Sequence, residues 1–508
     1  MQGVNRIIFN TVVLYAKILI CMAISLYSVP LLLHALGDSD YGLFNLIGGI
    51  ISMLAFMNAA MTLSTQRYLS VTIGERNHQK LLEVYNISII LHVIIGLAVV
   101  LLIELSMPLL FEYVLNIEQS RIPIAHLLFH LLVVSMFFHI MAVPFDALIN
   151  AYEEMMAFSI ISILESVLRL SAAVLLYYIS YDKLEIYGYA IALISIFIFI
   201  VKFAYSYFRY SHLRLSLSVV NNKSLFFQMF SFAGWNTLSS LAIISRNQGI
   251  ALVLNHFYGT VINTAYGIGN SVNSVLGYFS ATIQKSINPQ LMQSEGMHER
   301  QRLTMMSGAL TKYSLLCLGL LALPLLIETH TVLRLWLGEI PQHTIEFTRI
   351  IIILSIIFQS TSGIMSAVQS TGNIKWYTIF ISTILISTIP IVYIGTLGGL
   401  SPVTVLWSTC AIELLATFVR LAFARHLLNY PVIPYVKDIV VPCLTLIVCV
   451  GAILCILTMF FSESVFRLLL VCTADVILFW YGAYRFLLSA EEHSYIRKLL
   501  DVIKHRCH

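Results

Sequence analysis

Apolar runs of about 20 residues recur along nearly the whole chain, with short polar connections between them. Each run is long enough to cross a hydrocarbon core of roughly 30 Å. In lipid the backbone must satisfy its own hydrogen bonds, so runs of this length are predicted to be helices. A membrane β-barrel would need apolar and polar residues to alternate, and these runs do not alternate. The pattern predicts an all-α integral membrane protein with about fourteen transmembrane helices.

The connections between the predicted spans are short, and no stretch is long enough for a soluble domain. Very short turns near residues 157–206 and 376–424 leave the exact number of spans open. The predicted spans are residues 9–34, 43–64, 84–106, 122–145, 157–180, 187–206, 229–254, 262–284, 306–328, 348–370, 376–397, 403–424, 438–461 and 467–488.

Charged residues are scarce, and the basic ones concentrate on one set of connections. Only 11% of the residues are charged and 59% are hydrophobic, with a mean hydropathy of +0.88. Soluble proteins carry about 25% charged residues, so this composition excludes a soluble globular protein. With the N-terminus inside, roughly twenty basic residues fall on inner connections and termini, against five on outer ones. Both termini are therefore predicted to be cytoplasmic.

Short motifs recur between the two halves of the chain, in the same topological places. The matching motifs are Asn10-Thr11 with Asn236-Thr237, Tyr41-Gly42-x-x-Asn45 with Tyr266-Gly267-x-x-Asn270, and Glu75-Arg76-Asn77 with Glu299-Arg300-Gln301. The three pairs are separated by nearly the same length of chain, with small slips from one pair to the next. Such spacing is typical of an internal repeat.

The repeat predicts three parts: an N-terminal lobe over residues 1–225, a C-terminal lobe over 226–437, and two further helices with a basic tail over 438–508. Equivalent helices are six spans apart, an even number, so both lobes have one orientation. They would be related by a pseudo-two-fold axis along the membrane normal, with a cavity at their interface. This organisation is typical of alternating-access transporters and does not suit a simple channel.

Several loop and helix motifs resemble a known superfamily of membrane exporters. They are residues 30–49 (PLLLHALGDSDYGLFNLIGG), Asn288-Pro289-Gln290, Leu335-Trp336-Leu337-Gly338 and Gln369-x-Thr371-Gly372. This set resembles the bacterial polysaccharide flippases of the multidrug/oligosaccharidyl-lipid/polysaccharide (MOP) exporter superfamily, over nearly the whole chain. The resemblance implies two six-helix lobes around a central, often cationic, cavity. It also implies export of lipid-linked saccharide units for O-antigen, capsule or exopolysaccharide at a bacterial inner membrane.

Lys17 is the main candidate on the first predicted helix. Asn10, Lys17, Cys21 and Ser25 recur at intervals that place them on one helix face. Ionisable residues inside spans are costly and commonly functional. Lys17 would face the cavity and bind the phosphates of a lipid carrier, or it would extend its ammonium group to the cytoplasmic interface.

The seventh and eighth predicted helices are unusually polar. Arg246 lies deep in the seventh, with no carboxylate one turn away, so it is expected to face the cavity. Asn236 and Asn270 would bind sugar hydroxyls or serve as hydrogen-bonding contacts between helices.

Two further arginines are binding candidates with alternatives. Arg67 would bind a pyrophosphate on the cytoplasmic side, or act as an ordinary positive-inside anchor. Glu165 and Arg169 are spaced i, i+4 and are predicted to pair. Arg169 either belongs to that structural pair or contacts substrate while Glu165 holds its position.

A cation-coupled drug exporter would need a buried carboxylate that binds and releases an ion. Glu413 lies mid-span with no evident partner and is the best candidate for ion coupling. The first helix contains no carboxylate, which weighs against this class.

Catalytic and metal sites are not expected. His126 and His130 are four residues apart, but no cysteine or paired acid accompanies them, so no metal site is predicted. No phosphate-binding loop, dinucleotide fingerprint or Gly-x-Ser-x-Gly motif occurs, so nucleotide hydrolysis is not expected. Neither a cofactor nor a nucleic-acid partner is expected. A membrane polymerase or ligase would display a sizeable outer loop, whereas the longest here, about residues 329–347, is short.

The sequence thus predicts a non-enzymatic flippase for a polyprenyl-pyrophosphate-linked oligosaccharide. Its expected partners are the bilayer and this lipid-linked substrate, with a polysaccharide polymerase or glycosyltransferases alongside. The alternatives are a cation-coupled multidrug exporter and a peptidoglycan lipid-precursor flippase.

Overall fold

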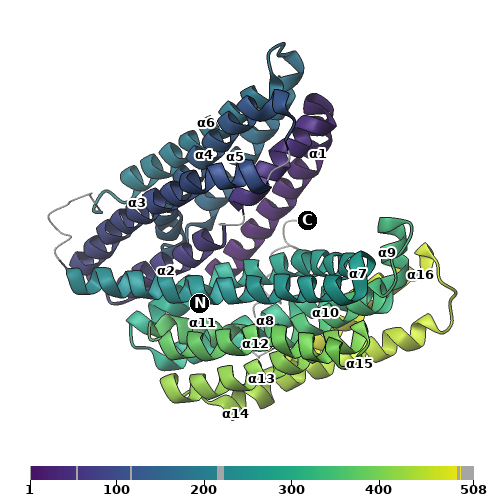
Figure 1. Cartoon of the computed structure of the whole chain (residues 1–508). Helices are drawn as coiled ribbons and strands as arrows, with labels where there is room; N and C mark the ends of the chain where they lie inside the picture. Colours follow the sequence, from purple (N-terminus) through teal and green to yellow (C-terminus); the bar gives the residue numbers. More distant parts are fainter. Residues whose placement is uncertain (1, 53–54, 115–116, 214–221, 489–491, 494–508) are drawn as a thin grey trace, which may run out of the picture. The chain divides into compact units, whose positions relative to one another are not determined.

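The computed structural model describes residues 2–52, 55–114, 117–213, 222–488 and 492–493, all in helices and short connections (Figure 1). Two compact units make up the chain. The first unit contains Met1–Leu241, Lys285–Arg300 and Ser370–Thr378. The second unit contains Ala242–Gln284, Gln301–Gln369 and Ile379–His508.

The helices of the first unit are α1 (Gln2–Ser52), α2 (Ala55–Gly74), α3 (His78–Leu109), α4 (Ile122–Ala151), α5 (Met155–Leu175) and α6 (Lys183–Arg209). Short π or 3-10 turns extend them at η1 (Leu110–Val114), η2 (Gln119–Arg121) and η3 (Leu176–Tyr178). The chain then continues as α7 (Lys223–Gly296), which begins and ends in the first unit and crosses the second unit between.

The second unit contains α8 (Arg300–Ile327), α9 (Thr329–Leu337), α10 (Thr344–Gln359), α11 (Ser362–Thr371), α12 (Lys375–Leu397) and α13 (Pro402–Leu428). Its C-terminal part contains α14 (Val432–Tyr435), η5 (Val436–Val440), α15 (Val441–Thr458), α16 (Val465–Gly482) and η6 (Ala483–Leu487). The last residues of α11 and the first of α12 belong to the first unit.

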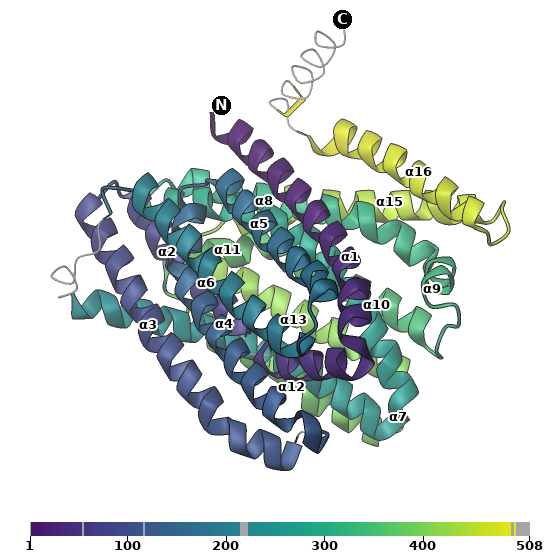
Figure 2. The same ribbon diagram turned by 90° about the horizontal axis from the view of Figure 1, so that it is seen from above.

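In the first unit α4 is the central helix and packs against α2, α3 and α6 (Figure 2). Buried side chains such as Phe129, Leu132 and Ile191 fill the interior of this bundle. At Gly188 a Cβ atom would lie 3.0 Å from Leu131 Cδ1. The absence of a side chain there therefore lets α6 approach α4 closely.

The described residues of the second unit form three apolar clusters. One joins α7, α10 and α13 around Leu254, Phe347 and Leu406. A second joins α7, α8 and α10 around Leu276, Leu318 and Ile352. The third joins α8 to the α15–α16 pair, around Leu323 and Val450. The two helices beyond the predicted repeat therefore pack against α8.

Many large apolar side chains lie on the outside of both units. On α3, Leu101, Leu102 and Leu105 are more than half exposed, as are Val448 on α15 and Ile477 on α16. Faces of this kind suit a hydrocarbon environment. Among the described residues, ten helices are long and apolar enough to cross a membrane, or eleven if the bent pair α10 and α11 forms one span. This supports a multi-pass membrane protein, although the predicted number of fourteen spans is not confirmed.

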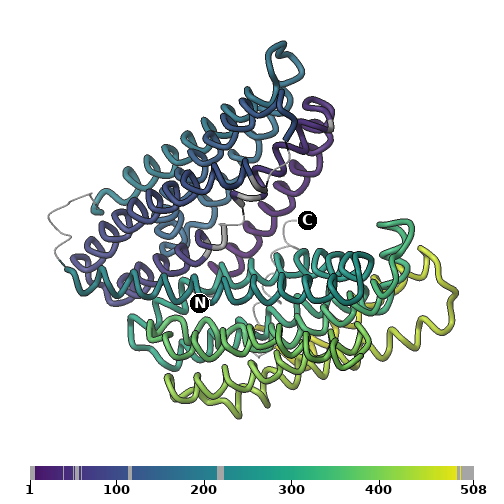
Figure 3. The backbone as a smooth tube through the Cα atoms, viewed as in Figure 1, coloured from purple at the N-terminus to yellow at the C-terminus, as the bar shows by residue number. Residues whose placement is uncertain are grey.

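Two bends explain part of the difference in span number. Inside α1, Gly37 adopts φ 79° and ψ 167°, and inside α7, Gly259 adopts φ 83° and ψ −177°. Figure 3 follows the backbone of both helices. This region of φ and ψ is open essentially only to glycine. A single residue therefore turns the chain where the sequence suggested a loop between two spans.

Four residues with positive φ form two pairs with the same separation along the sequence. Arg76 (φ 55°) and His298 (φ 58°) follow the ends of α2 and α7. The length of chain between these two residues equals the length between Gly37 and Gly259. The backbone thus repeats without slips, whereas the motif matches suggested a slightly longer and less regular separation.

Candidate substrate-binding site

Two lysines of the first unit share one aromatic ring. Lys17 comes from α1, Phe158 from α5 and Lys285 from the last part of α7. The Lys17 Nζ lies 5.2 Å and the Lys285 Nζ 3.3 Å from the centroid of the Phe158 ring. A cation over an aromatic face gains about 0.5–2 kcal/mol. This gain holds the two ammonium groups in place without neutralising them.

Neither lysine has a carboxylate partner in the part of the chain that the structure describes. The charged groups that act on Lys285 are Asp146, Lys17 and Lys202. Asp146 is already paired, because its Oδ2 lies 2.7 Å from Lys202 Nζ. These three lysines and one aspartate therefore carry a net positive charge, which suits an anionic ligand.

Arg169 is paired within its own helix, as the i, i+4 spacing predicted. Its Nη2 lies 2.9 Å from Glu165 Oε1. The same nitrogen lies 3.4 Å from His139 Nε2 on α4. The Glu165–Arg169 pair is confirmed, and a contact between Arg169 and substrate stays a prediction.

Arg67 is buried, and its guanidinium already forms a hydrogen bond and contacts two aromatic rings. The Nε donates to the Ser370 carbonyl at 3.0 Å. Its Cζ lies 4.6 Å from the centroid of Tyr68 and 5.2 Å from that of Phe232. In this conformation Arg67 joins α2 to the α11–α12 turn, and its binding of pyrophosphate stays a prediction.

In the second unit, Glu413 forms ion pairs with two arginines. Its Oε2 lies 2.7 Å from Arg246 Nη1, and its Oε1 lies 2.8 Å from Arg420 Nη2. Glu413 and Arg420 are both buried. The expectation that Glu413 lacks a partner is therefore wrong. Arg246 has no carboxylate one turn away, as the sequence indicated, but Glu413 on another helix neutralises it. Arg420 is two turns along the same helix from Glu413, and Arg246 is 167 residues away in the sequence.

Asn236 and Asn270 use their side-chain amides locally. Asn236 Nδ2 donates to the Phe232 carbonyl at 2.9 Å, and Asn270 Nδ2 donates to the Tyr266 carbonyl at 3.0 Å. Each bond returns to the preceding turn of the same helix. Their binding of sugar hydroxyls stays a prediction.

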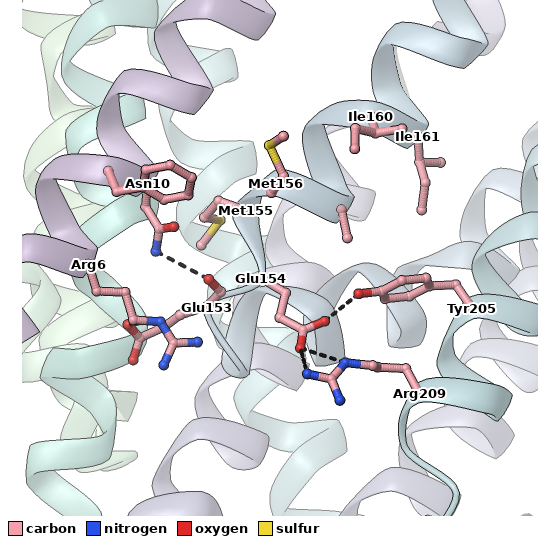
Figure 4. A pocket seen from close by; sticks show the side chains of 12 residues that line it. Arg6, Asn10, Glu153, Glu154, Met155, Met156, Ile160, Ile161, Tyr205 and Arg209 are labelled. Atoms are coloured by element: carbon pink, nitrogen blue, oxygen red, sulfur yellow. Dashed lines mark hydrogen bonds and ion pairs between the residues drawn. The ribbon is translucent and has the colours of Figure 1, made fainter. Parts of the chain in front are cut away.

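A cavity of about 480 Å³ opens in the first unit beside the α4–α5 turn (Figure 4). Met155, Met156 and Ile160 give it an apolar wall, and Arg6 and Arg209 stand beside Glu153 and Glu154. The full lining is Arg6, Phe9, Asn10, Glu153, Glu154, Met155, Met156, Ala157, Ile160, Ile161, Tyr205 and Arg209. None of the predicted binding residues lines this cavity.

Glu154 is the polar centre of the same region. Its Oε1 lies 2.8 Å from Arg209 Nη2. Tyr210 donates to its Oε2 at 3.0 Å, and Tyr205 donates to the same oxygen. Burial, together with the Glu154 carboxylate, raises the pKa of Tyr210 above its usual range. The charged groups around this cavity thus pair with one another. Among the described residues, Lys17 and Lys285 have no such carboxylate partner.

Sequence reasoning found Lys17 and missed Lys285. Lys285 directly follows the predicted span 262–284, so the apolar pattern places it on an inner connection. The structure places it inside α7, which continues to Gly296. A sign that the helix continues well beyond the apolar run would have indicated that Lys285 lies within it.

Neither a protein-family model nor a curated protein matches this sequence. Solved structures match over most of the chain. A MATE transporter in its bent conformation has a TM-score of 0.73 and 14% identity, covering 84% of this chain and 98% of that one.

Two other solved structures each have a TM-score of 0.71 and 13% identity, and each covers 84% of this chain and 98% of the other. One is a MOP superfamily transporter from Pyrococcus furiosus, for which reversed polarity of the binding pocket suggested a different function. The other is an outward-facing multidrug resistance MATE family transporter of the MOP superfamily. At these identities the likeness shows the fold, which is that of the MATE transporters.

Proposed function

We propose that this protein is an alternating-access membrane transporter whose substrate is an anionic amphiphile, a polyprenyl-pyrophosphate-linked oligosaccharide. The MATE-like fold and the many apolar helices support a transporter. The sequence resemblance to polysaccharide flippases supports the lipid-linked saccharide. The single observation that carries the substrate class is the pair Lys17 and Lys285 around Phe158 without a carboxylate partner.

Charge selects between an anionic and a cationic substrate. A cation exporter needs an acidic group that is free to bind its substrate or coupling ion. In the described part of the chain, Asp146, Glu165 and Glu413 are all paired with lysine or arginine. Asp475 on α16 is a buried carboxylate without a hydrogen-bond partner among the described residues, so it is the group that a cation-coupled exporter could use. Glu413 is paired twice, so its cluster also carries a net positive charge.

In the proposed mechanism the protein supplies binding and gating and no covalent chemistry. The two ammonium groups would donate charge-assisted hydrogen bonds to the diphosphate. The glycan would follow the polar side chains, and the lipid would remain in the bilayer. We place this activity in a bacterial inner membrane with both termini in the cytoplasm, alongside glycosyltransferases or a polymerase.

A multidrug exporter is the second candidate, and the solved structures support it better than the flippase. One of the similar structures is named as a multidrug resistance transporter. A peptidoglycan-precursor flippase shares the diphosphate chemistry and would use the same two lysines.

The test is complementation of a flippase-null strain, with surface polysaccharide and accumulated lipid-linked intermediate as readouts. A hydrogen bond to a charged group contributes about 1.5–3 kcal/mol, so Lys17→Gln and Lys285→Gln should each lower transport by about 10- to 100-fold. Lys17→Arg keeps the charge and should retain most activity. Lys223→Gln, at the exposed start of α7, is the matched control.

The outcomes separate the two candidates. Loss of transport in both glutamine variants, at normal membrane levels, supports the anionic substrate. If wild type leaves the lipid-linked intermediate unchanged but gives dye resistance, and Glu413→Gln abolishes that resistance at a normal membrane level, the chain is a drug exporter.

A further inference from the structure

The end of α2 and the end of α7 meet through two glycines. A Cβ atom at Gly74 would lie 2.2 Å from the Gln293 carbonyl oxygen. A Cβ atom at Gly296 would lie 2.0 Å from the Val71 carbonyl oxygen. Both distances are far below any ordinary contact with a Cβ atom, so only glycine permits this approach. All four residues belong to the first unit.

The two contacts are reciprocal. Gly74 and Gly296 are as far apart in the sequence as Val71 and Gln293 are. Each helix end therefore gives the glycine for one contact and the carbonyl for the other. The same separation holds for the positive-φ residues that follow the two ends. Equivalent helix ends of the repeat thus face each other at this point.

Buried hydrogen bonds surround the glycine contacts. Gln290 Nε2 donates to Glu153 Oε2 at 2.7 Å, and Gln293 Nε2 donates to the Ala151 carbonyl at 2.9 Å. On the other side, Arg67 donates to the Ser370 carbonyl. The end of α7 thus binds the α4–α5 turn, while α2 binds the α11–α12 turn.

The chemistry of this contact suits a surface that separates and re-forms. Its hydrogen-bonding groups are amides, carbonyls and one carboxylate, all of which water can solvate. Because each hydrogen bond exchanges for one with water, its net contribution is about 0.5–1.5 kcal/mol, or about 1.5–3 kcal/mol for the bond to the Glu153 carboxylate. Leu291 and Met292 of α7 are also buried here, and their exposure would oppose opening.

We propose that Gly74, Gly296, Glu153, Gln290 and Gln293 form a latch that closes the predicted cytoplasmic end of the transporter. The inference rests on the proposed alternating-access function, because that function requires one end to open and close. The latch is closed in this structure. Opening separates the end of α7 from α2 and from the α4–α5 turn.

The test measures access to Ser294, a buried residue of the contact. Ser294→Cys is introduced after the eight native cysteines are replaced. Inverted membrane vesicles are then treated with a membrane-impermeant maleimide. Gly74→Ala and Gly296→Ala should each raise the labelling rate on the order of tenfold, because the open population increases. Gly277→Ala, with open space around its Cβ position, is the control and should leave the rate unchanged.

A charge exchange covers the case in which an alanine variant does not fold. Gln290→Glu places a second carboxylate against Glu153 and should also open the latch by repulsion. Adding Glu153→Gln restores one donor and one acceptor and should return the slow labelling. Unchanged labelling in Gln290→Glu, or no recovery in the double variant, overturns the proposal.

The labelling needs no substrate, so it is independent of the transport assay. A latch that responds as expected in a chain that does not move lipid-linked saccharide would leave the latch in place and remove the proposed substrate. Normal flipping of the lipid-linked saccharide, with the same labelling rate in every variant, would support the proposed substrate and remove the latch.

Discussion

At the scale of single residues, a buried charge is meaningful only together with its partners. Glu413 seemed unpaired in the sequence, because its partners are two turns along the helix and 167 residues away. By contrast, the partner of Glu165 lies one turn away and was predicted. Lys17 could be selected because it stands alone in an apolar run. Gln290 belongs to the Asn288-Pro289-Gln290 motif, but nothing in that motif indicates a contact with Glu153. Gln293 gives no signal, since amides are common at helix ends.

The Arg246–Glu413–Arg420 cluster predicts the result of removing its anion. Glu413→Gln leaves the buried Arg420 and the partly buried Arg246 without a counter-charge, which should cost about 3–5 kcal/mol of stability. Thermal unfolding in detergent should show a clearly lower midpoint, and less protein should reach the membrane.

The second change in this cluster separates structure from ion coupling. Adding Arg420→Met to Glu413→Gln removes one of the unpaired charges and should recover part of the lost stability. A Glu413→Gln variant that is as stable as wild type but inactive would instead assign ion coupling to Glu413.

At the scale of helices, apolar runs identified where helices occur but not where they end. The predicted spans 229–254 and 262–284 lie on the two sides of the bend at Gly259 in α7, and the second part continues to Gly296. Hydropathy follows the apolar part of a helix, whereas the polar end of α7 is held by hydrogen bonds to distant segments. Contacts of this kind are absent from any local sequence pattern.

The two bends predict equal effects of equal substitutions. Gly37→Ala and Gly259→Ala force a side chain into a backbone region that costs of order 1–3 kcal/mol. Both should lower the midpoint of thermal unfolding by similar amounts, because the two glycines have nearly the same φ and ψ angles. Gly42→Ala and Gly267→Ala, which are helical and have open space, are the controls and should be neutral or slightly stabilising. Equal midpoints in all four variants would mean that the bends carry no strain.

At the scale of the whole molecule, the orientation depends on whether α1 and α7 each cross the membrane twice. Ten or eleven described helices pass a test of length and composition, whereas fourteen spans were predicted. The first half of α1 passes this test, but α2 and α7 do not. The polar residues of α7 include Gln290 and Gln293, which belong to the latch. The bends at Gly37 and Gly259 are where a double crossing would turn back.

Labelling of single cysteines with an impermeant thiol reagent decides the number of crossings. If both helices cross twice, Ser39→Cys and Thr260→Cys should react from outside the cell, together with Ser462→Cys in the α15–α16 connection. Asn429→Cys, at the end of α13, should react only from the cytoplasmic side, and Asn77→Cys, before α3, should do the same. This pattern is expected because each bend would lie on the other side of the membrane from the helix ends that carry the basic residues. Reaction of Ser39→Cys or Thr260→Cys from the cytoplasmic side would reduce the number of spans. It would also place the first lobe in an orientation in which α2 and α7 could not form a cytoplasmic latch.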